Sequence, residues 1–402
     1  MNALADMIPN ATPAELDLIE RYASLPADPR RERAFQAFAA GGLPHRRMEA
    51  WRWTDFKAGL KSLEAASAAP QADPFATVEA PVIVFDGGKL SAPDGLPAGL
   101  KLIERPTVDA YGAAEDLPLG ALAAALSDSP NGLIVEATDI VDTPLRFVFR
   151  GDGQIAFARI EILVREGASL EMLESHLGGA AFSASALGAK VEAGGALRRT
   201  LFQAGAANEA QAITASVELD AAARYAQTAL SFGAKLARLE TRLVHQGEGA
   251  EAVLNAAYLL GDGYHADLTS FVRHGAPACV TKQSTKGAVR DGGRGVFQGK
   301  FHVPRVGQKT DADMQHNALL LEDGAEVDAK PELEIYADDV ACAHGNTAGA
   351  LDADALFYMR QRGLPETDAR ALLTEAFIVE ALEEAGAGEE ALLVAARAWL
   401  AA

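Results

Sequence analysis

The spacing of hydrophobic and polar residues changes twice along the chain, which divides it into three regions. In the first region, Leu16 and Ile19 begin a series of apolar residues at the spacing of one helix face. Thr12 and Glu15 match the two ends of a capping box, which marks the start of a helix. We therefore expect residues 1–75 to form a helical region that ends in an alanine-rich linker.

From about residue 78 the apolar residues come in short runs, separated by glycine or proline. The runs are rich in β-branched and aromatic residues, which is typical of strands. They read PVIVF (81–85), GLIVE (132–136), LRFVF (145–149) and IAFARIEILV (155–164).

A turn of small residues followed by a strand then recurs at steps of 28, 27, 27 and 26 residues, and a second strand completes each unit. A fixed period in the twenties with two strands per unit predicts a stacked solenoid. The alternative is a β-sandwich in which the spacing arises by chance. We expect a mainly β chain whose residues 76–350 form a parallel β-helix. The turns are Gly167-Ala168, Gly195-Ala196, Ala222-Ala223, Gly249-Ala250 and Gly275-Ala276, and the next clear one is Gly324-Ala325.

Residues 351–402 return to helical spacing. Asp352 is placed to cap a helix that Gly363 ends, and Pro365 lies near the start of the next. This region either packs on its own solenoid or offers an apolar stripe to a partner protein.

A solenoid has two open ends whose backbone groups need a cover or a partner. We expect the N-terminal helices to cover one end. The last coil is expected at 333–340 with no strand after it, which makes it an edge for pairing with another subunit. The residues of that edge are Glu334, Tyr336, Asp338 and Val340.

Cys342 and His344 follow this edge, two residues apart. If they lie on a strand, their side chains point the same way. One thiol and one imidazole suit a soft metal or an iron–sulfur fragment, but two ligands do not close a site. The remaining ligands would have to come from another chain or from exogenous groups. The alternative is a buried apolar cysteine beside a structural histidine.

The formal net charge of -20 argues against a nucleic acid or an anionic membrane as the main partner. Two cysteines, Cys279 and Cys342, are too few for a disulfide scaffold and suit a reducing compartment. The sequence contains no signal-peptide pattern and no long apolar run, so we expect a cytoplasmic protein. It also lacks a P-loop and common hydrolase motifs, which argues against nucleotide hydrolysis by this chain.

Four segments resemble the SufB/SufD family of iron–sulfur cluster assembly proteins. The C-terminal stretch KPELEIYADDVACAHGNTAGALDADALFYMRQRG is similar to the signature of that family, as are LPETDARALLTEAF and TDADMQHNALLL (310–321). GLPHRRMEAWRWTDF (42–56) has a form typical of the SufD branch. Where the SufB branch has a cysteine after the leucine-rich strand, this chain has Ala325, and Gly345 stands where SufB has a glutamate. The resemblance is therefore to the SufD branch.

This resemblance implies a right-handed parallel β-helix between helical segments. It also implies a non-catalytic scaffold subunit that assembles with a SufB-like subunit and a SufC-like ABC ATPase. A transient iron–sulfur cluster would form where the last coils of the two β-helical subunits meet, and ATP hydrolysis would belong to the SufC-like partner. The histidine of the family falls on His344, with Cys342 beside it. Contacts with the ATPase fall on the helical tail, at Leu351, Phe357, Leu372, Leu373 and Phe377.

Two other functions remain open at this point. Parallel β-helices often carry polysaccharide-active sites, which is an analogy of fold alone. The chain is otherwise a purely structural subunit in which Cys342 and His344 only pack. The sequence does not reveal whether Cys342 is reactive, whether the chain forms a homodimer in isolation, whether the complex binds reduced flavin, or whether the chain delivers iron directly.

Overall fold

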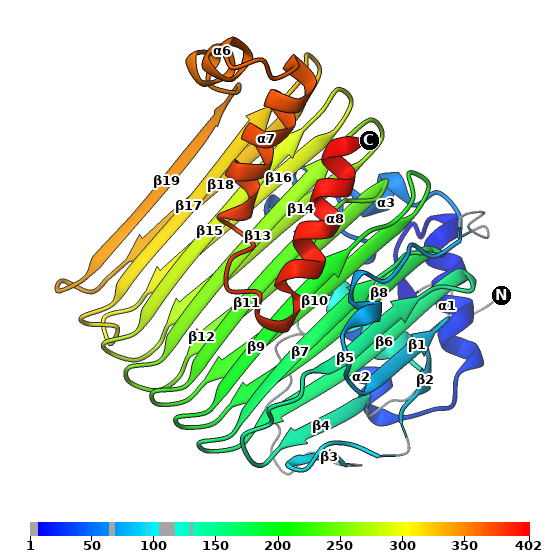
Figure 1. Cartoon of the computed structure of the whole chain (residues 1–402). Coiled ribbons are helices and arrows are strands. Elements are labelled where there is room, and N and C mark those ends of the chain that lie inside the picture. The colour runs from blue at the N-terminus through cyan, green and yellow to red at the C-terminus, as the bar shows by residue number, and fades with distance from the viewer. Residues whose placement is uncertain (1–6, 64–68, 94, 104–116, 129–131) are drawn as a thin grey trace.

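The structure is a computed structural model that describes residues 7–63, 69–93, 95–103, 117–128 and 132–402. Its centre is a β-solenoid in which two sheets run side by side along the whole stack (Figure 1). Helices flank the solenoid at both ends of the chain, so the expectation of a mainly β solenoid with helical flanks is confirmed. Residues 64–68 of the expected linker lie outside the described residues.

The first sheet has ten strands in the order β19-β17-β15-β13-β11-β9-β7-β5-β1-β2, and the second has nine in the order β18-β16-β14-β12-β10-β8-β6-β4-β3. Strands therefore alternate between the sheets as the chain winds. In the first sheet these are β1 (Val82–Asp86), β2 (Lys89–Ser91), β5 (Leu145–Arg150), β7 (Ser169–His176), β9 (Ala196–Gln203), β11 (Arg224–Ser231), β13 (Glu251–Leu260), β15 (Val280–Val289), β17 (Asp311–Leu320) and β19 (Ala341–Gly349). In the second they are β3 (Leu100–Ile103), β4 (Leu133–Ala137), β6 (Gly153–Val164), β8 (Ala180–Val191), β10 (Ala210–Leu219), β12 (Leu236–His245), β14 (His265–His274), β16 (Arg294–Val303) and β18 (Glu326–Ile335).

Successive coils pair in parallel, which produces the repeat seen in the sequence. Ser169 pairs with Ala196, and the ladder continues through each following strand of the first sheet to Ala341. One expected turn belongs to the other corner. Gly324-Ala325 precedes β18 of the second sheet, whereas β17 follows a longer turn around Gly307 that lacks the Gly-Ala pair.

Alternate residues of each strand point into the solenoid and form one long core. On β17, for example, Ala312 and Met314 are buried and Asp313 between them is not. Aromatic and aliphatic side chains such as Phe147, Phe297 and Phe301 fill the interior. A strand with this alternation buries one face only, so the other faces remain for the helices or for solvent.

The N-terminal helices cover the outer face of the second sheet, not the end of the solenoid as expected. They comprise α1 (Pro13–Ser24), α2 (Pro29–Ala39), η2 (Glu49–Trp51), α3 (Phe56–Gly59) and, further along, α5 (Pro118–Leu126). Their apolar side chains share a cluster with Phe157 and Phe182, which point outward from β6 and β8. The capping box expected at Thr12 and Glu15 is present. The helices pack on this face because its apolar outward side chains would otherwise be exposed to water. The first end of the stack, which the helices were expected to cover, is formed by β1–β3.

The C-terminal helices divide between packing and exposure. α7 (Glu366–Val379) and α8 (Glu389–Ala401), joined through η4 (Gly386–Gly388), bury Ile378, Leu382 and Leu392 on the outer face of the first sheet, where η3 (Pro74–Thr77) also packs. α6 (Ala353–Gln361) has no buried residue and stands away from the sheets beside the last coils (Figure 1). No helix in the described ranges is long and apolar enough to cross a membrane.

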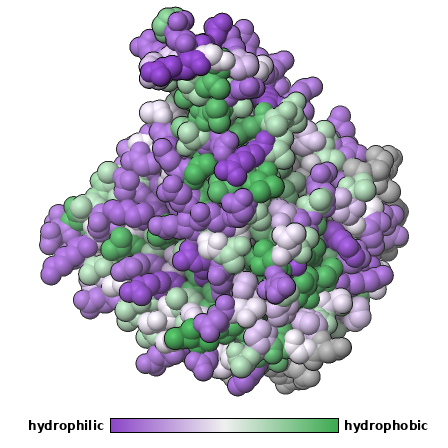
Figure 2. Space-filling model, viewed as in Figure 1, coloured by the Kyte–Doolittle hydropathy of each residue, from purple (hydrophilic) through white to green (hydrophobic). Residues whose placement is uncertain are grey.

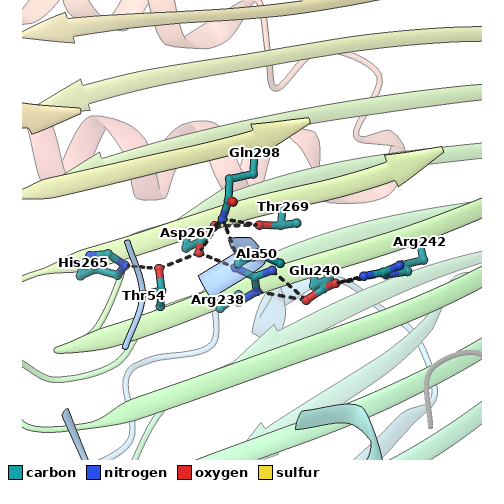
Figure 3. A network of polar contacts seen from close by, with 9 residues as sticks. All are labelled: Ala50, Thr54, Arg238, Glu240, Arg242, His265, Asp267, Thr269 and Gln298. Carbon is teal, nitrogen blue, oxygen red and sulfur yellow. Dashed lines mark hydrogen bonds and ion pairs between the residues drawn. The ribbon is translucent and has the colours of Figure 1, made fainter. Parts of the chain in front are cut away.

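A buried polar network fixes the N-terminal segment to the second sheet (Figure 3). The Arg238 guanidinium bonds to Asp267 (2.6 Å) and Glu240 (3.0 Å), donates to the carbonyl of Ala50 (2.9 Å) and lies 3.9 Å from the centre of the Trp51 ring. The Thr54 hydroxyl donates to Asp267 at 2.6 Å. Arg238 is buried, so its charge depends on these partners.

Replacing Arg238 by methionine should destabilise the fold by about 3–5 kcal/mol, because Asp267 would then be buried without a cation and Glu240 would keep only Arg242. The midpoint of thermal unfolding measures this. The control is Arg224→Met, since the Arg224 side chain is 72% exposed and its pair with Glu251 is loose. Equal midpoints for the two variants would contradict the role of the network.

Two histidines inside the solenoid stack on each other. The rings of His245 and His274 are 5.0 Å apart, and the Nε2 atoms of both lie 2.9 Å from the Thr281 hydroxyl. Burial lowers the pKa of His274 to about 4; burial and the neighbouring His274 lower the pKa of His245 to about 3. Both rings are therefore neutral, and the hydroxyl donates to one and accepts from the other.

Because both pKa values lie below that of an exposed histidine, the unfolded chain binds more protons in acid. Stability should therefore fall as pH drops through 6.5 and level off below about 3, with each ring costing about 2 kcal/mol between pH 7 and 5. Unfolding midpoints measured across this range for wild type and His274→Leu test the prediction. The variant should show a shallower pH dependence, and an unchanged slope would contradict it.

Candidate functional site at the open end of the solenoid

Cys342 and His344 lie on β19, the last strand of the first sheet. The pattern of residues in the sequence did not predict this strand. The expectation that no strand follows residues 333–340 is wrong, because the chain turns at 336–340 and β19 pairs in parallel with β17. The segment ACAHGNTAG has one β-branched residue, Thr347, and no Phe, Tyr or Trp, so the usual strand signal is weak. Pairing with β17 makes it a strand despite its composition.

The Cys342 and His344 side chains are on the inward face of β19. Cys342 pairs with Ala312 and His344 with Met314, and both partners are fully buried inward residues of β17. Cys342 also packs against the interior core. His344 remains exposed because no further coil lies on it. The two side chains therefore face the open end of the solenoid on one surface.

Burial raises the pKa of the Cys342 thiol, and the negative charge of Asp311 raises it further. The thiol is thus mostly protonated at neutral pH. Within the described ranges, no group of three or more His, Cys, Asp or Glu side chains is placed to hold a metal ion. The open end accordingly offers one thiol and one imidazole.

Three polar side chains beneath this end were missed by the sequence reasoning. The Tyr258 hydroxyl lies 2.9 Å from His316 Nε2, and His316 Nδ1 lies 2.7 Å from Asn346 Oδ1. An amide oxygen only accepts, so Nδ1 carries the proton and the tyrosine donates to Nε2. Burial lowers the pKa of His316 to about 4, which keeps it neutral. This chain of bonds holds β19, on which His344 lies, to the coils below.

The spacing of residues along the sequence does not reveal this series of hydrogen-bonded side chains. Its three members come from β13, β17 and β19, whose contact depends on the register of the coils. The one available signal is the histidine within TDADMQHNALLL, at an inward position of its strand.

The residues expected to form the edge are only partly on it. Glu334 lies on β18, where its carboxylate pairs with Lys300 at 2.7 Å. Tyr336, Asp338 and Val340 lie in the connection between β18 and β19, not on an edge strand. The edges are β18 and β19 themselves, because the chain continues into one more strand.

Of the residues on the helical tail that were expected to contact a partner, some are exposed and others are packed against the protein itself. Phe357 on α6 is 64% exposed and Leu372 on α7 is 46% exposed. Leu351 and Leu373 are half-buried. Phe377 packs against the solenoid, with the Lys286 ammonium 4.5 Å from its ring centre. Phe357 and Leu372 therefore remain available at the surface, whereas Phe377 already has an intramolecular role.

Fold and site together define a class: a parallel β-solenoid whose last coil is open and presents one thiol and one imidazole side by side. The family model described as "SUF system FeS cluster assembly, SufBD core domain" matches residues 147–377, which is more than half of the chain. This protein therefore belongs to the SufBD family of iron–sulfur cluster assembly proteins.

Individual relatives match a shorter part. The iron–sulfur cluster assembly protein SufD of Escherichia coli (strain K12) is 37% identical over 163 residues, covering 40% of this chain and 38% of that protein. A SufBD family protein of Synechocystis, slr0076, is 37% identical over 161 residues, covering 40% and 36%. SufB of Bacillus subtilis (strain 168) is 26% identical over 244 residues, covering 59% and 52%. The chain thus spans about two fifths of the length of the first two curated relatives.

Cys342 should react slowly with iodoacetamide at pH 7, because its pKa is raised and the thiolate is the nucleophile. We expect a rate at least several-fold below that of free cysteine, rising as pH increases. Cys279 should react only on unfolding, since it is buried. Alkylation followed by mass spectrometry measures both sites, and urea-unfolded protein is the control. Reaction of Cys342 faster than free cysteine would contradict the prediction.

Proposed function

We propose that this chain is a SufD-type, non-catalytic scaffold subunit that assembles iron–sulfur clusters together with a SufB-like subunit and a SufC-like ABC ATPase in the cytoplasm. The nascent cluster is the cargo, held where the last coils of the SufB-like subunit and this chain meet. His344 contributes an imidazole and Cys342 lies beside it. Glu334 and the 336–340 connection border that interface.

The observation that carries this proposal is the inward pair on an open coil. A soft or borderline metal takes three or four ligands, so Cys342 and His344 leave coordination positions for a partner to fill. The unpaired backbone groups of β18 and β19 supply the means of joining another β-structure. The metal site and the subunit interface would thus form together when the partner subunit binds.

A SufD-type subunit, as opposed to a SufB-type one, is supported by the stronger identity to the SufD of Escherichia coli than to the SufB of Bacillus subtilis. Ala325, at the position where the SufB branch has a cysteine, supports the same choice. The α6 surface at Phe357 and the α7 surface at Leu372 are proposed to bind the SufC-like ATPase, because they remain exposed on helices beside the interface.

The buried carboxylate of Glu174 gives no support to polysaccharide hydrolysis. Glu174 is buried, which opposes its ionisation, but Arg199 at 2.7 Å and the neighbouring His176 hold its pKa at about 2. A general acid for glycoside cleavage needs a raised pKa and access to substrate. Glu174 has neither property.

The test is co-expression with the SufB-like and SufC-like partners, comparing wild type, His344→Ala and His302→Ala for bound iron and sulfide. We expect His344→Ala to assemble the complex with a large loss of both elements, about tenfold if the imidazole is a direct ligand. His344 is exposed, so the substitution should not disturb the fold.

His302→Ala is the matched control, because His302 is a half-buried histidine of the neighbouring β16, on the outward face against Phe271 and Tyr336. It should retain iron and sulfide. If His344→Ala also retains them, the Cys342–His344 pair is structural. If the wild-type chain does not assemble with the partners, the proposed scaffold role is wrong.

A further inference from the structure

The N-terminal region carries a basic pocket that the proposed scaffold role does not use. The pocket has a volume of about 440 Å³ and includes His45, Arg46, Arg47 and Lys57 in its lining. His45, Arg46, Arg47 and Asp55 of its lining come from the stretch GLPHRRMEAWRWTDF (42–56), and none of its residues belongs to β18 or β19. In a chain with a net charge of -20, such a concentration of cations needs an explanation.

Lys57 is held in place by a buried carboxylate. Its ammonium lies 3.0 Å from Glu15, which is fully buried and also accepts the backbone N–H groups of Thr12 (2.7 Å) and Leu43 (2.8 Å). Burial opposes ionisation of Glu15, but these bonds keep its pKa below the usual value. An ammonium has three donors and Glu15 has two oxygens, so Lys57 retains a donor for a further acceptor.

His45 has a defined tautomer when neutral. The backbone N–H of Arg47 donates to His45 Nδ1 at 3.2 Å, so Nδ1 must accept. The ring proton of the neutral imidazole is therefore on Nε2, where it serves as a donor. The same bond fixes the ring within the tight turn in which the Met48 N–H donates to the His45 carbonyl.

The two arginines have no acidic partner among the described residues. In the part of the chain that the structure describes, no carboxylate lies within ion-pair distance of Arg46 or Arg47, and both are exposed. Asp55 is the one carboxylate among the lining side chains, and it already accepts the Ala58 N–H at 2.8 Å as a helix cap. The pocket therefore combines four donor side chains with one lining carboxylate, and its two arginines are not neutralised by a described carboxylate.

We propose that this pocket binds the phosphate group of a small phosphate monoester. Guanidinium groups bind phosphate oxygens in a bidentate manner, and an ammonium adds a point charge. A phosphate dianion has enough oxygens for His45, Lys57 and the two arginines together, whereas a single carboxylate does not. The volume is within the range of small-molecule sites and exceeds what a phosphate group alone fills, which favours an organic ester over the free ion.

Calorimetric titration of the full chain at low ionic strength tests the proposal, with glycerol 3-phosphate and inorganic phosphate as probes and glycerol as the uncharged control. We expect saturable binding of glycerol 3-phosphate and no binding of glycerol. Tighter binding of the ester than of inorganic phosphate supports an organic ligand, and equal binding supports recognition of the phosphate group alone.

The double variant Arg46→Glu/Arg47→Glu should bind at least about tenfold more weakly. Arg33→Glu is the matched control, because Arg33 is an exposed arginine of α2 outside the pocket, and it should bind as wild type does. Unchanged unfolding midpoints show that the variants are folded. No saturable binding of either phosphate by the wild type, or equal loss in Arg33→Glu, would overturn the proposal. Iron and sulfide content is not involved, so this result is independent of the cluster experiment.

Discussion

The structure depends on one interaction, the parallel backbone pairing between each coil and the next. Every strand from β5 to β17 has a neighbour on both sides in its own sheet, so its backbone donors and acceptors are used within the chain. At β18 and β19 the pairing stops, and one row of groups in each strand has no partner in the sheet. The backbone pairing that builds the fold therefore leaves an edge at β18 and β19 whose unpaired N–H and C=O groups can bond to another strand.

That edge determines the surroundings of Cys342 and His344. Inside the stack, inward polar residues bond to one another, as the Thr281 hydroxyl does to the Nε2 atoms of His245 and His274. On β19 the inward residues have neighbours on one side only, and His344 stays exposed over the buried Met314. An inward position on the last coil is thus an unoccupied place in the core, which a partner protein or a cluster can fill.

The solenoid could be predicted from the sequence because its signal is local and repeated. Short apolar runs and small-residue corners recur in every coil, as at Gly167 and Gly249, where positive φ angles occur in the turns. β19 was missed because ACAHGNTAG is poor in strand-forming residues and acquires its conformation from β17. Alternation predicted that Cys342 and His344 point the same way on a strand, but their inward orientation and the Tyr258–His316–Asn346 chain depend on the register of the coils. The position of the N-terminal helices could not be predicted from local sequence patterns either, because it depends on the apolar outer faces of β6 and β8.

The short segment around η2 and Thr54 contacts four consecutive coils: Arg238 on β12, Asp267 on β14, Gln298 on β16 and Lys330 on β18. Solenoid coils normally contact only their neighbours, so an array of them unfolds from its ends in steps. The segment around η2 and Thr54 changes this behaviour, because it bonds to several coils and so couples them to one another. Fraying of β18 therefore also breaks the Lys330–Glu49 ion pair, which joins the last coil to a segment near the start of the chain that is itself bonded to coils further inside the array.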